Sequence, residues 1–320
     1  MRAPIQLDLH LPNFNHPDTT PETLFDKLTD IARTAEDAGF SSISVMDHLH
    51  QIPGVGPRTN WMLEGNAVIA ALAARTERIN LTLLVGGVAY RNPALHAKIT
   101  TTIDIISGGR AVHGLGAGWY EEEHLAYGYG FPPLKERFER LEDALRISRA
   151  MFTEEEPTVE GTHHSVKDVL NNPKPLRGDI PILIGGSGER KTLRMVAQYA
   201  DGSNLFGDVE HVKHLLGVLE GHCETFDRDP GEITKTRMAT VLIAPSHDEA
   251  QRRLAALPEI GRERIAATGF VGDPGEVAEQ AQAYIDAGMD GLTFSMPEVH
   301  DLEQLALAGE TLSEVVGTRR

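Results

Sequence analysis

The chain has 320 residues, 41% of them hydrophobic, and its 30 basic and 47 acidic residues leave a formal charge of −17. This charge argues against a nucleic-acid partner or an anionic membrane surface, because neither offers a counter-charge. The single cysteine, Cys223, excludes an intrachain disulfide and a cysteine cluster for a metal ion. Since neither a secretory signal nor a run of roughly 18 apolar residues is present, we expect a cytoplasmic protein with no membrane span and no metal site.

Short apolar segments alternate with amphipathic helical segments along the chain. Strands are predicted, in chain order, at 5–11, 41–47, 78–88, 110–119, 180–188, 201–206, 237–244 and 290–296. Helices are predicted between them at 21–40, 63–75, 93–106, 135–152, 189–200 and from about 208. In the first helix, apolar residues recur at helical spacing from Leu24 to Ala35, and Gly39 stands where a C-terminal cap belongs.

About eight strands with helices between them are the number in a closed parallel barrel, so the predicted fold is α/β, a (β/α)8 TIM barrel. A doubly wound open sheet is the alternative, but the series runs through residues 1–320 without an obvious linker, which favours one domain. Two segments interrupt the alternation of predicted strands and helices. Residues 153–179 are predicted to be a turn-rich excursion with a hairpin at Glu160-Gly161, and residues 245–272 an inserted helical piece.

The second predicted strand ends in the stretch "VMDHLH", which delivers Asp47 and His48 into a loop. In a barrel, the loops after the strands share the face on which active sites form. An acid and an imidazole at that face suggest proton transfer or polar contact with a ligand. The structural alternative is that Asp47 caps the following turn and His48 packs locally, and the residues themselves leave both readings open.

Glycines follow three of the predicted strands. Gly86 and Gly87 end the third strand, where they permit a bulge or close approach of a flat ligand. After the fourth strand, small residues suggest a floor beneath a planar ring, with Trp119 beside it: Gly114, Gly116, Ala117 and Gly118. The spacing there only superficially resembles a dinucleotide-binding loop, because no helix is predicted to begin within it.

The stretch "ILIGGSGERKTL" (182–193) places four small residues between a strand and a helix: Gly185, Gly186, Ser187 and Gly188. Backbone N–H groups at a helix N-terminus, approachable because glycines lack side chains, form an anion site. Arg190 and Lys191 add positive charge in an otherwise acidic chain. We therefore expect this loop to bind a phosphate, with a tight turn that binds nothing as the alternative.

With these motifs in order, the chain resembles the luciferase-like monooxygenase superfamily and, within it, the coenzyme F420 (deazaflavin)-dependent oxidoreductases. The resemblance covers essentially the whole chain and is carried by "GFSSISVMDHL", "LLVGGVAYRNPALHAKITTTIDIISGGRAVHGLGAGWYEEEHLAYGYGFPPLKERFERLEDAL" and "PILIGGSGERKTLRMVAQYADGSN". It implies a barrel whose strand ends hold the cofactor ring, with Asp47 hydrogen-bonded to the cofactor and His48 near the reacting carbon. It also implies a strand-three bulge with a non-proline cis peptide near Leu83-Leu84, ring contacts at Gly86, Ala117 and Gly118, and a phosphate loop at Gly185, Gly186, Ser187 and Gly188.

The resemblance implies hydride transfer between F420 and a small organic substrate, with His48 exchanging a proton and Asp47 adjusting the pKa of His48. The family's sugar-phosphate dehydrogenases carry a glutamate where this chain has Trp119, so a bulkier, less charged substrate against Trp61, Tyr90 and Trp119 is expected. An FMN-dependent monooxygenase and a non-catalytic flavin- or deazaflavin-binding protein are the alternatives. Relatives commonly pair through the helices at 92–106 and 135–152, which predicts a homodimer.

Overall fold

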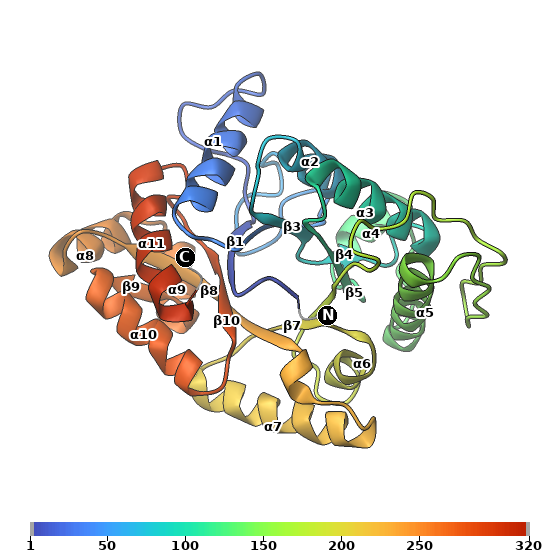
Figure 1. Cartoon of the computed structure of the whole chain (residues 1–320). Helices are drawn as coiled ribbons and strands as arrows, with labels where there is room; N and C mark the ends of the chain where they lie inside the picture. Colours follow the sequence, from blue (N-terminus) through green and yellow to red (C-terminus); the bar gives the residue numbers. More distant parts are fainter. Residues whose placement is uncertain (1–2, 318–320) are drawn as a thin grey trace.

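The protein is seen in a computed structural model that describes residues 3–317. Its central element is a closed barrel of eight parallel strands (Figure 1). These are β1 (Leu7–Leu11), β2 (Ser42–Val45), β3 (Asn80–Leu83), β5 (Ala111–Gly116), β6 (Ile182–Gly185), β7 (Gly202–Leu205), β8 (Thr234–Ile243) and β10 (Gly291–Ser295). Strand β10 pairs with both β8 and β1, which closes the ring. The predicted (β/α)8 barrel is therefore confirmed, and the open sheet is excluded.

The barrel strands are buried on both faces, as is usual for parallel sheets covered by helices. In β1, Leu7, Leu9 and Leu11 belong to the main apolar core. Because side chains alternate along a strand, the intervening Asp8 and His10 point into the barrel, where they are 2% and 4% exposed. The barrel interior is therefore partly polar at this level, which matters for the site below.

Helices surround the barrel (Figure 1). They are α1 (Leu24–Asp37), α2 (Gly65–Ala73), α3 (Pro93–Ser107), α5 (Leu134–Thr153), α6 (Thr192–Tyr199), α7 (Val209–Thr225), α10 (Pro274–Asp286) and α11 (Leu302–Val316). Two helix caps have the expected geometry. The Asn92 side chain accepts from two backbone N–H groups at the start of α3, and Gly39 follows α1 with φ 98°.

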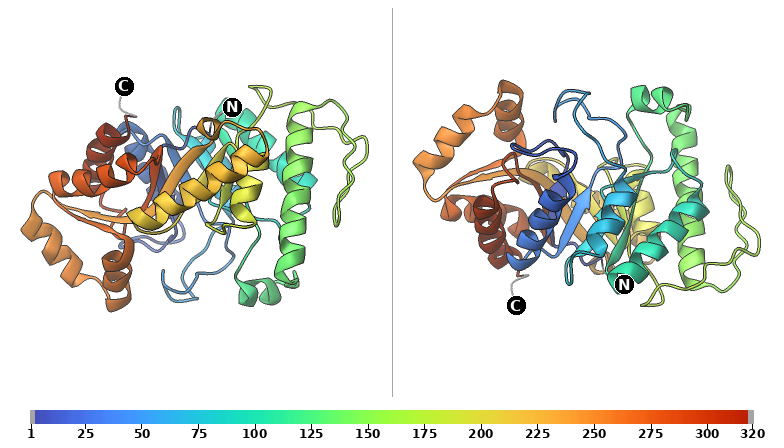
Figure 2. Two further views of the ribbon diagram at one scale, coloured as in Figure 1. Left: turned by 90° about the horizontal axis from the view of Figure 1, so that it is seen from below. Right: turned by 90° about the horizontal axis from the view of Figure 1, so that it is seen from above.

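The two excursions are present. Within 153–179, Val159 and Val166 form an antiparallel bridge, so the chain turns back between them as the hairpin prediction required. Residues 245–272 hold α8 (His247–Ala256), α9 (Glu259–Thr268) and β9 (Phe270–Gly272), which pairs with the last residues of β8. Figure 2 shows both excursions at opposite edges of the molecule. Several elements were not predicted: α4 (Glu121–Ala126), the 3-10 turn η1 (Pro230–Glu232), β9 and the two helices α10 and α11. The short strand β4 (Gly86–Gly87) lies within the predicted third strand, which the structure divides in two.

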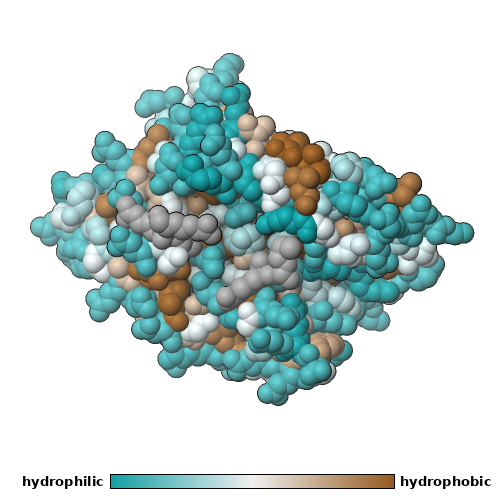
Figure 3. Space-filling view, in the orientation of Figure 1, coloured by the Kyte–Doolittle hydropathy of each residue, from teal (hydrophilic) through white to brown (hydrophobic). Residues whose placement is uncertain are grey.

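The face of the molecule in Figure 3 is mostly hydrophilic, with small separate hydrophobic areas. This agrees with a chain of high net charge, whose surface is covered by solvated ionic side chains. Among residues 3–317, no helix is both long and apolar enough to span a bilayer.

Candidate active site

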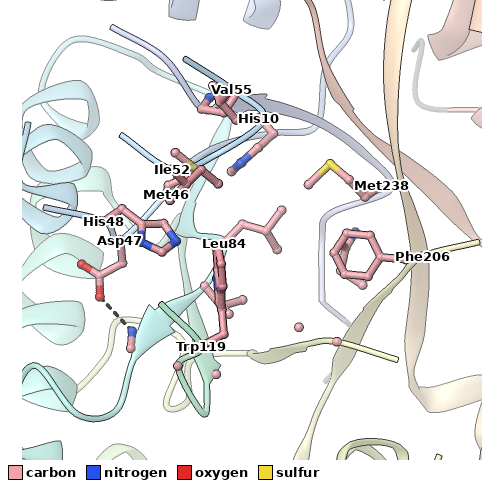
Figure 4. Close-up of a pocket in the computed structure, with 18 of the residues that line it drawn as sticks. His10, Met46, Asp47, His48, Ile52, Val55, Leu84, Trp119, Phe206 and Met238 are labelled. Atoms are coloured by element: carbon pink, nitrogen blue, oxygen red, sulfur yellow. Dashed lines mark hydrogen bonds between the residues drawn. The ribbon is translucent and has the colours of Figure 1, made fainter. Parts of the chain in front are cut away.

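A cavity of about 390 Å³ lies where the barrel strands end (Figure 4). It is lined by residues at or just after the C-terminal ends of β1, β2, β3, β5, β6 and β7 and by Met238 of β8. The lining residues are His10, Pro12, Met46, Asp47, His48, Ile52, Val55, Leu84, Val85, Gly87, Tyr90, Gly116, Gly118, Trp119, Gly185, Gly186, Asn204, Phe206 and Met238. A concave, largely apolar site at this face of a barrel is where a ligand is expected.

The structure brings eight of the predicted site residues together in this cavity: Asp47, His48, Leu84, Tyr90, Gly118, Trp119, Gly185 and Gly186. Six others lie outside the set that lines it: Trp61, Leu83, Gly86, Ala117, Ser187 and Gly188. Trp61 packs against the main core, and its backbone N–H donates to the Asn15 side chain at 2.7 Å. The structure therefore gives no support to Trp61 as a wall of this cavity.

The hydrogen-bond partner of His48 is Glu123, whose carboxylate lies 2.8 Å from Nδ1. Glu123 is fully buried on α4, although its neighbours Glu121 and Glu122 are exposed. Its other oxygen accepts from the backbone N–H of Leu49 and, at 2.9 Å, from that of His50. The Tyr90 hydroxyl also donates to the carboxylate. Glu123 thus ties the loop after β2 to the loop after β5.

These donors determine the charge of Glu123. Burial raises the pKa of the Glu123 carboxyl. Hydrogen bonds from His48, Tyr90 and the His50 backbone lower this pKa by a larger amount, so that it falls to about 2. The group is therefore a carboxylate at neutral pH, and a carboxylate only accepts hydrogen bonds. It follows that Nδ1 of His48 donates and that, in the neutral ring, Nε2 carries the lone pair. The ring of His48 lies at the cavity wall (Figure 4).

Asp47 has a different set of partners from those expected. Its carboxylate forms a two-point ion pair with Arg91, at 2.6 and 2.7 Å, and accepts from the backbone N–H of Gly87 at 2.8 Å (Figure 4). Asp47 is therefore not the hydrogen-bond partner of His48, whose imidazole is bound by Glu123 instead. Arg91 also pairs with Glu64, the N-cap residue of α2, so this arginine links the segment after β4 to the end of β2 and to the start of α2.

A non-proline cis peptide joins Leu84 to Val85, one bond further along than predicted. It lies in the bulge between β3 and β4, and this bulge explains two of the glycines. A Cβ on Gly114 would come within 1.9 Å of the Leu83 carbonyl, and one on Gly116 within 2.6 Å of the Val85 side chain. The bulge therefore packs against both glycines, and Leu84 and Val85 form the floor of the cavity together with Gly116, whereas Gly114 does not line it.

Gly86 serves packing outside the cavity. A Cβ there would meet Cε1 of His96 at 2.4 Å and the Gly114 carbonyl at 2.9 Å. His96 lies on α3, on the outer side of the barrel, and is buried. The close approach of α3 thus requires glycine at position 86.

The 185–188 loop is partly engaged within the protein. The backbone N–H of Gly186 donates to the Asn204 carbonyl at 3.1 Å, and the Ser187 hydroxyl accepts from the Phe206 N–H at 2.9 Å. Helix α6 begins at Thr192 rather than directly after Gly188. Gly186 has φ 117°, a conformation that glycine adopts without strain. Two of the groups expected to bind phosphate thus join the ends of β6 and β7.

Of the two other predicted pocket aromatics, Tyr90 donates to Glu123, and Trp119 stands beside His48 in an edge-on contact with ring centroids 5.6 Å apart. Trp119 is 57% exposed although it lines the cavity, so it lies at the mouth. Burial and the hydrogen bond to Glu123 raise the pKa of the Tyr90 hydroxyl, which keeps this group protonated as a donor.

Sequence reasoning missed several cavity or supporting residues, which include Glu123, Arg91, His10, Phe206 and Met238. Nothing in "YEEEH" distinguishes the buried Glu123 from its two exposed neighbours. A signal for His10 was present, however. In "LDLHL" the polar residues alternate with leucines, and a period of two in a buried barrel strand directs one set inward.

Comparison with known proteins identifies the family of this chain. The family model described as luciferase-like monooxygenase matches residues 5–262. The F420-dependent glucose-6-phosphate dehydrogenase of Microbacterium testaceum is 30% identical over 321 aligned positions, covering 89% of this chain and 92% of that protein.

Solved structures agree on the fold. The monooxygenase RslO1 from Streptomyces bottropensis superposes with a TM-score of 0.80 at 20% identity, covering 97% of this chain and 99% of that one. An F420-dependent secondary alcohol dehydrogenase in complex with an F420-acetone adduct gives 0.78 at 18% identity, covering 99% of each chain. With the family model matching most of its length, the chain belongs to the luciferase-like monooxygenase family.

Proposed function

We propose that the protein is an F420-dependent oxidoreductase that transfers a hydride between the cofactor and a neutral organic substrate. The observation that carries the proposal is the His48–Glu123 pair at the wall of a largely apolar cavity, at the strand ends of a barrel. The similarity to F420-dependent relatives over most of the chain supports the cofactor assignment. The FMN-dependent reaction is the competing assignment.

The residues present fit a flat cofactor. Leu84 and Val85 line the cavity at the strand ends, and Gly118 and Gly186 line it without side chains that would fill it. These residues, with Asp47 and Gly185, would hold the ring system, while Gly188, Arg190 and Lys191 would meet its phosphate. Arg190 and Lys191 are exposed beside the loop, as a phosphate contact requires.

F420, when bound, supplies the hydride donor or acceptor. The protein provides the proton transfer. Because Glu123 holds Nδ1–H of His48, the Nε2 lone pair can accept the hydroxyl proton of an alcohol as it is oxidised, and the protonated ring can return it to a carbonyl in the reverse direction. Glu123 then stabilises the imidazolium as a fully buried counter-charge. His48 is thus the proposed catalytic acid or base.

The lining favours a neutral substrate. Among the described residues that line this cavity there is no lysine or arginine, and the one carboxylate among them, Asp47, is neutralised by Arg91. A sugar phosphate needs cationic or multiple N–H partners when it leaves water. The relatives are named for glucose-6-phosphate, but Trp119, Phe206 and Met238 suit a less polar molecule, such as a secondary alcohol or its ketone.

Titration of the purified apo-protein with F420 and with FMN, followed by fluorescence quenching, tests the cofactor. We expect F420 to bind at least ~10-fold more tightly, a difference of about 1.4 kcal/mol. A panel of neutral alcohols, with glucose-6-phosphate as the charged comparison, is then offered to the F420-loaded enzyme while reduction of F420 is followed by absorbance. Tighter FMN binding would reverse the cofactor assignment, and turnover of glucose-6-phosphate alone would reverse the substrate class.

A further inference from the structure

Phe206 is an apolar side chain that the protein leaves half uncovered at the cavity. It follows the last residue of β7, lines the cavity and is 51% exposed. Figure 4 draws its ring with Met238 on the side of the cavity away from His48. An uncovered ring in a cavity wall gains free energy when an apolar group of a ligand covers it.

The backbone on both sides of this ring is held by hydrogen bonds. The Phe206 N–H donates to the Ser187 hydroxyl at 2.9 Å. The carbonyl of the next residue, Gly207, accepts from Nε of Arg237 at 3.1 Å and from the Tyr284 hydroxyl at 3.4 Å. These contacts from the 185–188 loop, β8 and α10 fix the direction in which the Phe206 side chain leaves the backbone.

Arg237 is a buried cation without a counter-charge in contact. It is 1% exposed, and because it alternates with Met238 along β8, its side chain points out of the barrel toward the helices. Among the residues that the structure describes, no carboxylate pairs with it, and its Nη1 has no hydrogen-bond partner. Its guanidinium carbon lies 4.4 Å from the ring centroid of Tyr284 and 5.4 Å from that of Phe270.

Such a cation lowers the stability of the fold, and an apolar side chain in its place is often tolerated at least as well. Burial lowers the pKa of the Arg237 guanidinium, but an arginine stays protonated in a protein. Its Nε–H group is directed at the Gly207 carbonyl. The contact that accounts for an arginine here is therefore the one that fastens the loop carrying Phe206.

Building on the proposed function, we propose that Phe206 contacts the substrate and selects molecules with an apolar ring beside the reacting alcohol or carbonyl, with Arg237 and Tyr284 as positioning residues. A substrate whose reacting group reaches His48 presents its remaining part to the side of the cavity where Phe206 lies. Because the ring is held before the ligand arrives, binding does not have to order it.

The placement of the ring can be followed by ¹⁹F NMR of protein that carries 4-fluorophenylalanine, with the Phe206 signal identified by its loss in Phe206→Ala. Arg237→Met and Arg237→Gln form a matched pair, because methionine places a methyl group, and glutamine an N–H₂ group, where arginine has Nε. In cofactor-free protein, we expect the Phe206 signal to shift and broaden in Arg237→Met and to return toward the wild-type signal in Arg237→Gln. An unchanged signal in a folded Arg237→Met protein would remove the positioning role.

Arg228→Met is the control for the loss of an arginine, because Arg228 also donates to backbone carbonyls, those of Val196 and Ala197 on α6. It should leave the Phe206 signal unchanged.

A loss of stability is separated from a loss of positioning by thermal melting. The melting temperature of Arg237→Met should not fall, since this variant removes a buried, unpaired charge. Should it fail to fold, Tyr284→Phe takes its place, because it removes the second donor to the Gly207 carbonyl and keeps the ring beside the guanidinium. An unchanged Phe206 signal in Tyr284→Phe would then remove the positioning role.

Cyclohexanol, a neutral secondary alcohol with an apolar ring, is the probe of substrate contact. It is titrated into F420-loaded wild type, Phe206→Ala, Arg237→Met and the double variant, and in the wild type it should shift the Phe206 signal. We expect its affinity to fall about fivefold in Phe206→Ala, the effect of losing roughly 40 Å² of buried apolar area. Arg237→Met should weaken binding in the same direction, and the double variant should bind no more weakly than Phe206→Ala, because both changes act through one ring.

Saturation with cyclohexanol that leaves the Phe206 signal of the F420-loaded wild type unmoved would overturn the contact, even if F420 alone had shifted that signal. Additive losses in the double variant would show that Arg237 acts elsewhere. Failure of cyclohexanol to bind would refute the substrate class. Failure of F420 to bind would refute the proposed function and leave the positioning result in cofactor-free protein intact.

Discussion

His48 is held by a carboxylate 75 positions further along the chain, and Asp47 by an arginine 44 positions further along. These two neighbours in sequence therefore belong to separate networks. Glu123 orients the proposed catalytic ring, whereas Arg91 and Asp47 fasten the loop that follows the bulge. At the scale of single residues, substitutions at 48, 123 and 47 should have different consequences, which three measurements can separate.

Replacing His48 by alanine should lower single-turnover hydride transfer by ~10²-fold or more, the usual effect of losing a general acid or base. The affinity for F420 should stay close to wild type, because the ring is at the cavity wall, whereas the melting temperature should fall modestly, because the buried Glu123 carboxylate loses one of its donors. His247→Ala, at an exposed histidine on α8, is the control and should keep full turnover. Normal turnover in a folded His48→Ala protein would exclude His48 from the chemistry.

Glu123 should make stability depend on pH. Its folded pKa of about 2 lies below the ordinary value of 4.5, so its stabilising contribution is present above pH 4.5 and is lost as the pH falls towards 2. The shift corresponds to at most about 3 kcal/mol. Urea unfolding between pH 2 and 7 should show this loss in the wild type and a much smaller one in Glu123→Gln. Parallel curves for the two proteins would contradict the assignment.

Asp47→Asn should lower the free energy of unfolding by about 3 kcal/mol, because it leaves the Arg91 guanidinium partly unpaired in a buried setting. Glu64→Gln, on the more exposed side of the same arginine, should cost no more than about 1 kcal/mol. Denaturant unfolding compares the two. If Asp47→Asn is as stable as wild type and only binds F420 more weakly, then Asp47 acts mainly on the cofactor, as the family resemblance implies.

At the scale of elements, the bulge between β3 and β4 decides the shape of the floor. The sequence pattern predicted one strand that ends in glycines, whereas β3 ends at Leu83 and the glycines form the separate strand β4. A bulge was one of the two interpretations of those glycines. The pattern did not show what approaches each glycine. Gly114 and Gly116 accommodate the bulge itself, Gly86 accommodates His96 of α3, and Gly186 adopts a left-handed conformation. Glycine is therefore needed for three different reasons: space for the bulge, space for α3, and a positive φ angle.

Gly86→Ala should destabilise the protein by about 1–3 kcal/mol, because the added methyl group overlaps His96 and the Gly114 backbone. Its affinity for F420 per folded molecule should be unchanged. Gly217→Ala in α7, where the added methyl group meets nothing within 4 Å, is the matched control and should stabilise the helix by up to about 1 kcal/mol. Thermal melting and F420 titration of both variants separate a packing role from a ligand contact.

At the scale of the whole molecule, we propose a homodimer formed through α3 and α5. Leu95 and Ile106 of α3 and Leu134 of α5 are about half exposed, and association of two protomers through these helices would bury them. Light scattering at micromolar concentration should give twice the chain mass. Leu95→Glu combined with Leu134→Glu should give monomers, whereas Leu176→Glu in the 153–179 excursion should not. A monomeric wild type would refute the dimer.

The sequence by itself determined the barrel and the face that carries the site. Apolar periodicity, helix caps and strand ends are local patterns, so they can be read along the chain, and they correctly placed Asp47, His48 and the 185–188 loop after strands. Only the tertiary structure decided that Glu123 pairs with His48, that Arg91 pairs with Asp47, that Leu84 and Val85 form the floor, and that Ser44 links Asp8 to His10. Each of these pairings joins separate strand or loop segments, and the partner of a polar side chain depends on which segments the closed barrel brings into contact.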